Sequence, residues 1–202
     1  MKKSLQLALQ PSVIAAILWV AFGTGLFAQE VVVFAKDDSL ALGSGTSGNT
    51  VTNPAKASFL AAFKADLAHP SAFKEPAKLT DLPDYGRKVP GAGGEIRYHA
   101  SFHGGFVILT TLEGLIPNHR YILTLNGNPE RAGNTNLMET VSHNSKEKYY
   151  DFQTITTDAT GRYNATYGLV LPAGPYDVRF YVKDTADFKI VLYRDFFKFT
   201  VE

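Results

Sequence analysis

The stretch TTDATGRYNATYGLVLPAGPY, from Thr156 to Tyr176, decides the fold. Asp158 and Gly161 suit a tight turn, because aspartate can accept a bond from the backbone two residues on and glycine tolerates a positive φ. An aromatic strand follows, and a second turn lies at Pro172 to Pro175. Tyr176 would then lie at the edge of a core, with its ring buried and its hydroxyl bonded to the backbone upstream. The strands that flank the first turn either form a hairpin or cross between two sheets.

The pattern T-D-x-x-G-x-Y followed by L-P-x-G-x-Y resembles the signature of the prealbumin-like or carboxypeptidase-regulatory-like sandwich, which CnaB-type repeats of bacterial surface proteins share. The resemblance covers residues 156 to 176 and implies an immunoglobulin-like fold with a tyrosine corner. By analogy, it also implies an exported module without catalytic activity. The matching residues are Thr157, Asp158, Gly161, Tyr163, Leu171, Pro172, Gly174 and Tyr176.

Outward from this stretch, apolar and polar residues alternate with period two from Glu95 onward, as half-buried strands require. Gly104-Gly105 and the segment from Gly114 to Asn118 mark turns, and a long polar loop runs from Asn126 to Lys148. The chain from 95 to 202 is therefore predicted to be all-β, an antiparallel immunoglobulin- or prealbumin-like β-sandwich of about seven strands. The predicted strands are 95–103, 106–115, 120–127, 149–157, 162–171, 176–184 and 189–201.

The first 94 residues are expected to precede this domain. Residues 1–28 have the basic start, apolar run and small final residue of a bacterial signal peptide, with cleavage after Ala28 or after Ala35. The alternative is an uncleaved anchor from Val13 to Ala35, which would be the only membrane contact. Residues 29–94 are predicted to be a linker or arm with one short helix at about 54–68. The protein is thus expected to be periplasmic or secreted.

Composition excludes several functions. The 202 residues carry a formal net charge of +1, so no field attracts nucleic acid. No cysteine is present to form disulfides or thiolate metal sites. Gly43, Gly45 and Gly48 match the dinucleotide-binding pattern G-x-G-x-x-G. In a true dinucleotide site this loop joins a strand directly to a helix, whereas here Asn49 to Pro54 lengthen the loop, so we expect no nucleotide to bind there. We expect no cofactor, and because no nucleophile motif is present, nothing in the sequence supports an enzyme.

Outward-facing tyrosines are the first candidate binding residues. Tyr149 and Tyr150 are adjacent, so a strand must send one of them outward, and Tyr181 falls on the face opposite Phe180. Outward tyrosines can stack on sugars or anchor a protein contact. We therefore expect a glycan- or protein-binding module of the cell envelope that uses Tyr149, Tyr150 and Tyr181 with Asn134 and Asn136 of the polar loop. The alternative is that the N-terminal arm and helix partly cover these faces.

Histidines support a second hypothesis, a periplasmic copper- or zinc-binding protein. The candidate ligands are His99, His103 and His143. On one straight strand His99 and His103 would lie roughly 13 Å apart, so shared ligation requires a bend at Gly104. Solvated loop histidines are the simpler interpretation.

Overall fold

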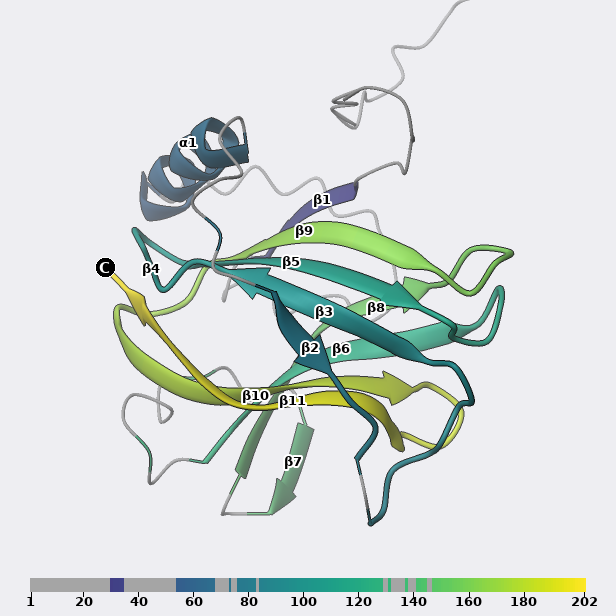
Figure 1. The fold of residues 1–202 in the computed structure, drawn as a ribbon. Helices are drawn as coiled ribbons and strands as arrows, with labels where there is room; N and C mark the ends of the chain where they lie inside the picture. Colours follow the sequence, from purple (N-terminus) through teal and green to yellow (C-terminus); the bar gives the residue numbers. More distant parts are fainter. Residues whose placement is uncertain are drawn as a thin grey trace, which may run out of the picture.

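Two β-sheets and one helix make up the described part of a computed structural model of this chain (Figure 1). The structure describes residues 30–34, 54–67, 73, 76–82, 84–128, 131, 137, 141–144 and 147–202. It confirms the all-β prediction, with sheets that are largely antiparallel. Residues 1–28, the predicted signal peptide, lie outside the described residues. No helix within the described ranges is both long and apolar enough to span a bilayer.

The first sheet has the strand order β1-β9-β5-β3-β2. Its strands pair antiparallel except for β1, which runs parallel to β9. β1 comes from the region predicted to be an arm, so this region contributes to the sheet. The strands are β1 (Glu30–Phe34), β2 (Ala77–Leu79), β3 (Gly93–Tyr98), β5 (Phe106–Glu113) and β9 (Tyr163–Leu169).

The second sheet has the order β4-β11-β10-β6-β8-β7 and faces the first (Figure 1). It contains a short strand, β7, within the region predicted to be a polar loop. The strands are β4 (Ser101–Phe102), β6 (Arg120–Gly127), β7 (Val141–Asn144), β8 (Glu147–Thr156), β10 (Gly174–Asp184) and β11 (Ile190–Val201).

The prediction of one continuous strand at 95–103 is wrong, because the structure divides this segment between the two sheets. β3 pairs with β5 in the first sheet, while β4 pairs with β11 in the second. The step occurs at His99 and Ala100. The His99 N–H donates to the Val107 carbonyl of the first sheet, and the Ala100 carbonyl accepts from Thr200 of the second.

The turn after β8 carries the chain from the second sheet to the first. The strands that flank it therefore cross between the sheets and do not form a hairpin, which is one of the two predicted alternatives. Asp158 Oδ1 accepts from the Thr160 N–H at 2.8 Å, the predicted bond two residues on. Gly161 has φ 74°, and a Cβ built there would lie 2.0 Å from the Leu115 carbonyl oxygen. Only glycine can occupy this position without moving the neighbouring loop.

An aromatic column joins the sheets. Tyr176 is 1% exposed, and its hydroxyl donates to the Pro172 carbonyl at 2.7 Å, which confirms the predicted upstream bond. Its ring stacks on Phe199, with centroids 4.9 Å apart, and Phe199 stacks on Phe106 of the opposite sheet at 3.8 Å. Burial raises the pKa of Tyr176 to about 12. The hydroxyl therefore stays protonated as a donor.

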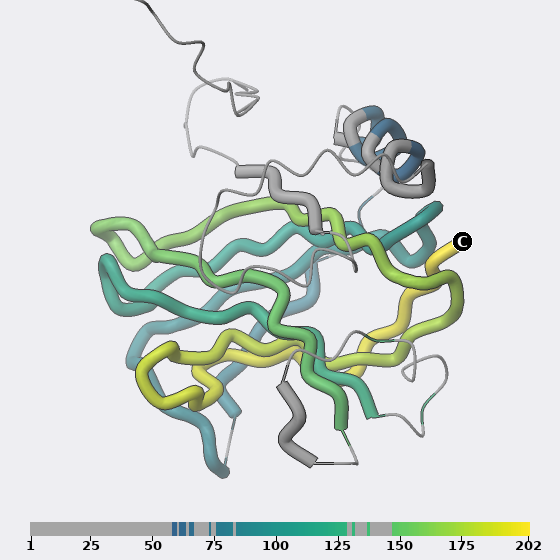
Figure 2. Tube along the Cα trace, turned by 180° about the vertical axis from the view of Figure 1, so that it is seen from behind, coloured from purple at the N-terminus to yellow at the C-terminus, as the bar shows by residue number. Residues whose placement is uncertain are grey.

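Helix α1 (Pro54–Leu67) packs on the first sheet, on the side away from the second (Figures 1 and 2). Phe59 and Phe63 are buried against Val107 of β5. Gly168 leaves room for them, because a Cβ there would lie 2.9 Å from the Phe59 ring. Asp66 adds a polar contact, with its Oδ2 2.6 Å from His99 Nε2. Helix α1 therefore covers part of the first sheet, whereas the outward tyrosines Tyr149 and Tyr181 lie on strands β8 and β10 of the second sheet.

We expect the substitution Phe59→Ala to release α1 without unfolding the sheets, because Phe59 belongs to a cluster separate from the core between the sheets. Loss of a buried phenyl ring costs about 3 kcal/mol, which should speed amide exchange in α1 by roughly 100-fold. Hydrogen exchange measures this. Ser58→Ala, at an exposed position of the same helix, is the control. Equal acceleration in β5 and β9 would contradict the prediction.

Candidate functional site

One end of the two sheets is formed by four connections, which we call the loop end: residues 84–88, 114–119, 158–161 and 184–189 (Figure 1). Backbone hydrogen bonds join them. Leu115 donates to Gly161 at 3.1 Å, and Thr185 donates to Arg120 at 3.3 Å. Arg87 donates to Ile190 at 2.7 Å. Segments far apart in the sequence thus form one continuous surface.

Asp184 holds the loop end together. Its side chain is 0% exposed, and it accepts from Arg87 Nη1 at 2.6 Å, from the Ala186 N–H at 2.8 Å and from His119 Nε2 at 3.0 Å. Burial alone would raise the pKa of Asp184, but the Ala186 N–H, His119 and Arg87 outweigh it and hold the pKa below its usual value. The carboxylate therefore stays charged and joins three connections.

The turn after β10 presents a phenyl ring to solvent. Phe188 has φ 59° and is 61% exposed. A left-handed backbone is unfavourable for a bulky residue. The turn is nevertheless fixed, because the Phe188 N–H donates to the Asp184 carbonyl at 2.9 Å and Asp187 accepts from both Lys189 N–H and Arg87.

Exposed apolar surface gathers at the same end. Across the part of the chain that the structure describes, the exposed large hydrophobic side chains are Tyr85 (73%), Ile116 (39%) and Phe188 (61%). All three lie on connections of the loop end. Apolar side chains that gather at one place on a surface mark a contact site more often than scattered ones do.

The predicted tyrosine site is only partly assembled. Tyr149 and Tyr181 come together on the outer face of the second sheet, with ring centroids 6.4 Å apart. Tyr150 lies on the opposite face, 4% exposed, in the core. The expectation that Tyr181 is exposed is corrected, because it is 5% exposed. Asn134 and Asn136 lie outside the described residues.

Hydrogen bonds explain the burial of these outward tyrosines. The Tyr181 hydroxyl donates to Asn126 Oδ1 at 3.1 Å, and the Tyr149 hydroxyl donates to Glu147 Oε2 at 2.5 Å. Burial raises the pKa of Tyr181 to about 12. Beside them, Lys183 is paired with Asp151 at 2.5 Å, and both side chains are at most 5% exposed. This face is a closed polar network, so it offers little ring surface to a ligand.

The histidines of the metal hypothesis occupy different surroundings. His99 is 6% exposed and bonds Asp66, whereas His103 is exposed in the turn after β4. The backbone of His143 lies in β7, and its side chain is outside the described residues. Among the side chains that the structure describes, no three of His, Cys, Asp or Glu form a group that could hold a metal ion.

Comparisons with protein-family models, curated proteins and solved structures find no match. The candidate site therefore rests on the geometry of the loop end. Sequence reasoning missed it, although one signal was present. The turn DTADFK, from Asp184 to Lys189, places an aromatic residue among polar turn residues.

Replacing Asp184 with asparagine should lower the free energy of unfolding by about 3 kcal/mol near pH 7, because Arg87 and His119 lose a buried charged acceptor. A carboxyl group whose pKa is lowered on folding stabilises the fold above its unfolded pKa, near 3.8, and loses this effect as the pH falls through the folded value. The difference between wild type and variant should shrink as the pH falls below about 3.8.

Urea unfolding at several pH values measures this difference. Asp187→Asn, at a more exposed carboxylate, should cost less than about 1 kcal/mol. A difference for Asp184→Asn that does not change with pH would contradict the assigned role of its charge.

Proposed function

We propose that this protein is an exported, non-catalytic module of the bacterial cell envelope that binds a protein partner through its loop end. One observation carries the proposal: Tyr85, Ile116 and Phe188, the exposed large hydrophobic side chains of the described residues, each lie on one of the three connections that Asp184 joins. A rigid apolar surface binds with little loss of conformational entropy. Export is supported by the apolar, signal-like segment at residues 1–28.

We further propose that the domain is an immunoglobulin- or prealbumin-like β-sandwich. Support comes from the two facing sheets, the bond from the Tyr176 hydroxyl to Pro172 and the crossing turn at Asp158 to Gly161. In immunoglobulin-type sandwiches the loops at one end bind ligands. The loop end is likewise one end of two facing sheets, and this analogy supports a binding role without naming the partner.

A protein is favoured over a glycan as partner. Sugar recognition combines an aromatic platform with polar groups that bond hydroxyls. At the loop end Arg87, His119 and Asp187 already bond within the network. The side chains that project are phenol, phenyl and branched aliphatic groups, which suit the apolar core of a protein interface.

Site-specific photo-crosslinking in the source cells tests the proposal. A benzophenone side chain replaces Tyr85, Ile116 or Phe188 in turn, and also Lys198, an exposed residue near the other end of β11, as the control. We expect the same discrete protein adduct from the three loop-end positions and none from 198. Adducts of equal yield at 198, or none at any position, would contradict the proposal. Adducts carrying glycan alone would change the class of partner.

Phe188→Asn should separate binding from stability. Asparagine tolerates a left-handed backbone, and the phenyl ring is mostly in solvent, so the free energy of unfolding should rise by about 1 kcal/mol. The adduct formed at position 85 should at the same time fall at least tenfold, because the partner loses its aromatic contact. Thermal unfolding and adduct yield measure the two effects. A less stable variant with unchanged adduct yield would contradict both expectations.

The position of β1 favours cleavage after Ala28 over cleavage after Ala35. Glu30 to Phe34 pair with β9, so the earlier site keeps this edge strand and the later site removes it. We expect the exported protein to begin at Gln29. N-terminal sequencing of the mature protein distinguishes this outcome from a chain that begins at Lys36 or one that retains Met1.

A further inference from the structure

Helix α1 occupies a surface that is shaped for one aromatic ring. Phe59 is 0% exposed, although it belongs to a cluster separate from the core between the sheets. Two glycines make room for its ring: a Cβ built at Gly105 would lie 2.5 Å from the ring, and one built at Gly168 would lie 2.9 Å from it. A larger residue at either position would displace the ring. The outer side of the first sheet therefore carries a defined socket for this side chain.

A buried polar contact lies beside the socket. His99 is 6% exposed, and its Nε2 atom lies 2.6 Å from Asp66 Oδ2 of the helix. The rings of Phe73 and Phe102 pack on the imidazole, with centroids 4.6 and 5.2 Å away. An apolar site with one placed polar group fixes the orientation of what it binds. This surface therefore fits the sequence of α1 in particular.

β1 and α1 together form a unit that can separate from the two sheets. β1 pairs through its backbone with the edge strand β9, and α1 packs through Phe59 and Phe63 (Figure 1). We call residues 30–34 and 54–67 the N-terminal unit. Because its apolar cluster is separate from the core, the unit can leave the surface without opening the core.

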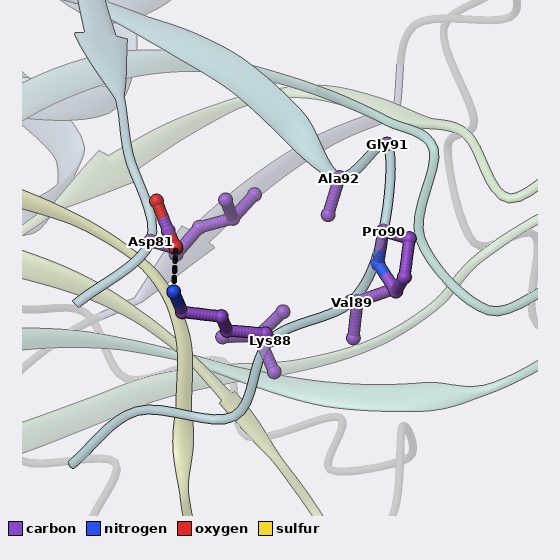
Figure 3. Close-up of a pocket in the computed structure, with 8 residues that line it drawn as sticks. Asp81, Lys88, Val89, Pro90, Gly91 and Ala92 are labelled. Carbon is purple, nitrogen blue, oxygen red and sulfur yellow. Dashed lines mark ion pairs between the residues drawn. The ribbon is translucent and has the colours of Figure 1, made fainter. Parts of the chain in front are cut away.

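Beyond a short connection the chain is fixed to the sheets. Phe73 packs on His99, and Val89 and Ala92, drawn in Figure 3, pack on the core. Residues 68–72 join α1 to Phe73, and Pro70 favours an extended backbone at the residue before it. Five extended residues span about 17 Å. The connection can therefore lead α1 away from its own sheets to those of a neighbouring molecule.

We propose that the N-terminal unit exchanges between two copies of this chain, so that the unit of each copy occupies the socket and the β9 edge of the other. The contacts that the unit makes on its own chain form equally well on a second copy, which makes such an exchange a low-cost route to a dimer. The connection with Pro70 favours the exchanged form, because there it stays extended and need not fold back.

The exchanged dimer would carry two loop ends on one assembly. Two linked sites bind a repeated partner more tightly than one site does, because the second contact becomes intramolecular. This consequence rests on the proposed protein partner. The exchange itself does not, because it involves the socket and the β9 edge and no residue of the loop end.

Disulfide trapping in the mature protein tests the exchange, because the natural chain has no cysteine. Val31 and Thr166 are Cα partners across β1 and β9, and a disulfide can span the distance between neighbouring strands. One preparation carries Val31→Cys and a second carries Thr166→Cys. The two are incubated together at high protein concentration and then oxidised. We expect a covalent heterodimer linked between positions 31 and 166, which mass spectrometry of the linked peptide identifies.

Two controls make the result decisive. Leu109 and Thr166 are Cα partners across β5 and β9, outside the N-terminal unit, so Leu109→Cys mixed with Thr166→Cys should give no heterodimer. A single chain with both Val31→Cys and Thr166→Cys should close its own disulfide at low concentration. Closure within this chain combined with no heterodimer from the Val31→Cys mixture overturns the proposal. Equal heterodimer yield from the Leu109→Cys mixture overturns it, and so does a pair that closes in neither case, because β1 then does not pair with β9.

Further variants show whether the helix docks on the second copy. Phe59→Ala, added to the chain that carries Val31→Cys, should lower the heterodimer yield at least about tenfold, because the ring that fills the socket is lost. Ser58→Ala, at an exposed position of α1, is the matched control and should leave the yield unchanged. Phe188→Asn in both chains should also leave it unchanged, which distinguishes exchange from a contact through the loop end. An unchanged yield with Phe59→Ala overturns the proposal.

Discussion

The stack of Phe199 between Tyr176 and Phe106 is the contact on which the arrangement of the two sheets depends. Phe106 belongs to the first sheet and the other two rings to the second, with centroid distances of 3.8 and 4.9 Å. Three aromatic rings bury a large apolar area, and the stacking of their flat faces admits few alternative geometries. Because the Tyr176 hydroxyl is bonded to Pro172, the column also fixes the turn before β10. The relative position of the sheets then determines where all later connections meet.

Short strands flank the long ones at every edge described. β1, β2, β4 and β7 contain 5, 3, 2 and 4 residues, and they border β9, β3, β11 and β8. A long unpaired edge would invite pairing with other chains, and very short edge strands limit this hazard. The chain uses segments outside the predicted sandwich for this purpose: β1 and β2 both come from the first 94 residues. These two strands of the predicted arm therefore belong to the first sheet.

The alternation of apolar and polar residues predicted most of the strands, because it can be seen in neighbouring residues alone. Ile96 and Tyr98 of β3 are an example. The division of the segment 95–103 could not be predicted in this way, since it depends on Val107 and Thr200 as hydrogen-bonding partners. The burial of Tyr181 likewise depends on Asn126, 55 residues away. The loop end was missed for the same reason. Asp184 bonds Arg87 across 97 residues, and no spacing in the sequence indicates that contact.

Two residues other than glycine have a positive φ among the described residues, and both lie at the loop end. Asn118, with φ 51°, is a residue type that tolerates this conformation, so its turn needs no further explanation. Phe188 is not such a residue, and with 61% of its surface in solvent it gains little from burial. Asparagine or glycine would satisfy the turn at lower cost. The buried Asp184 side chain fixes this turn, but the turn carries a phenyl ring at the residue with the left-handed backbone. The protein is therefore less stable than it would be with asparagine or glycine at position 188. Such a loss of stability is a feature of contact sites.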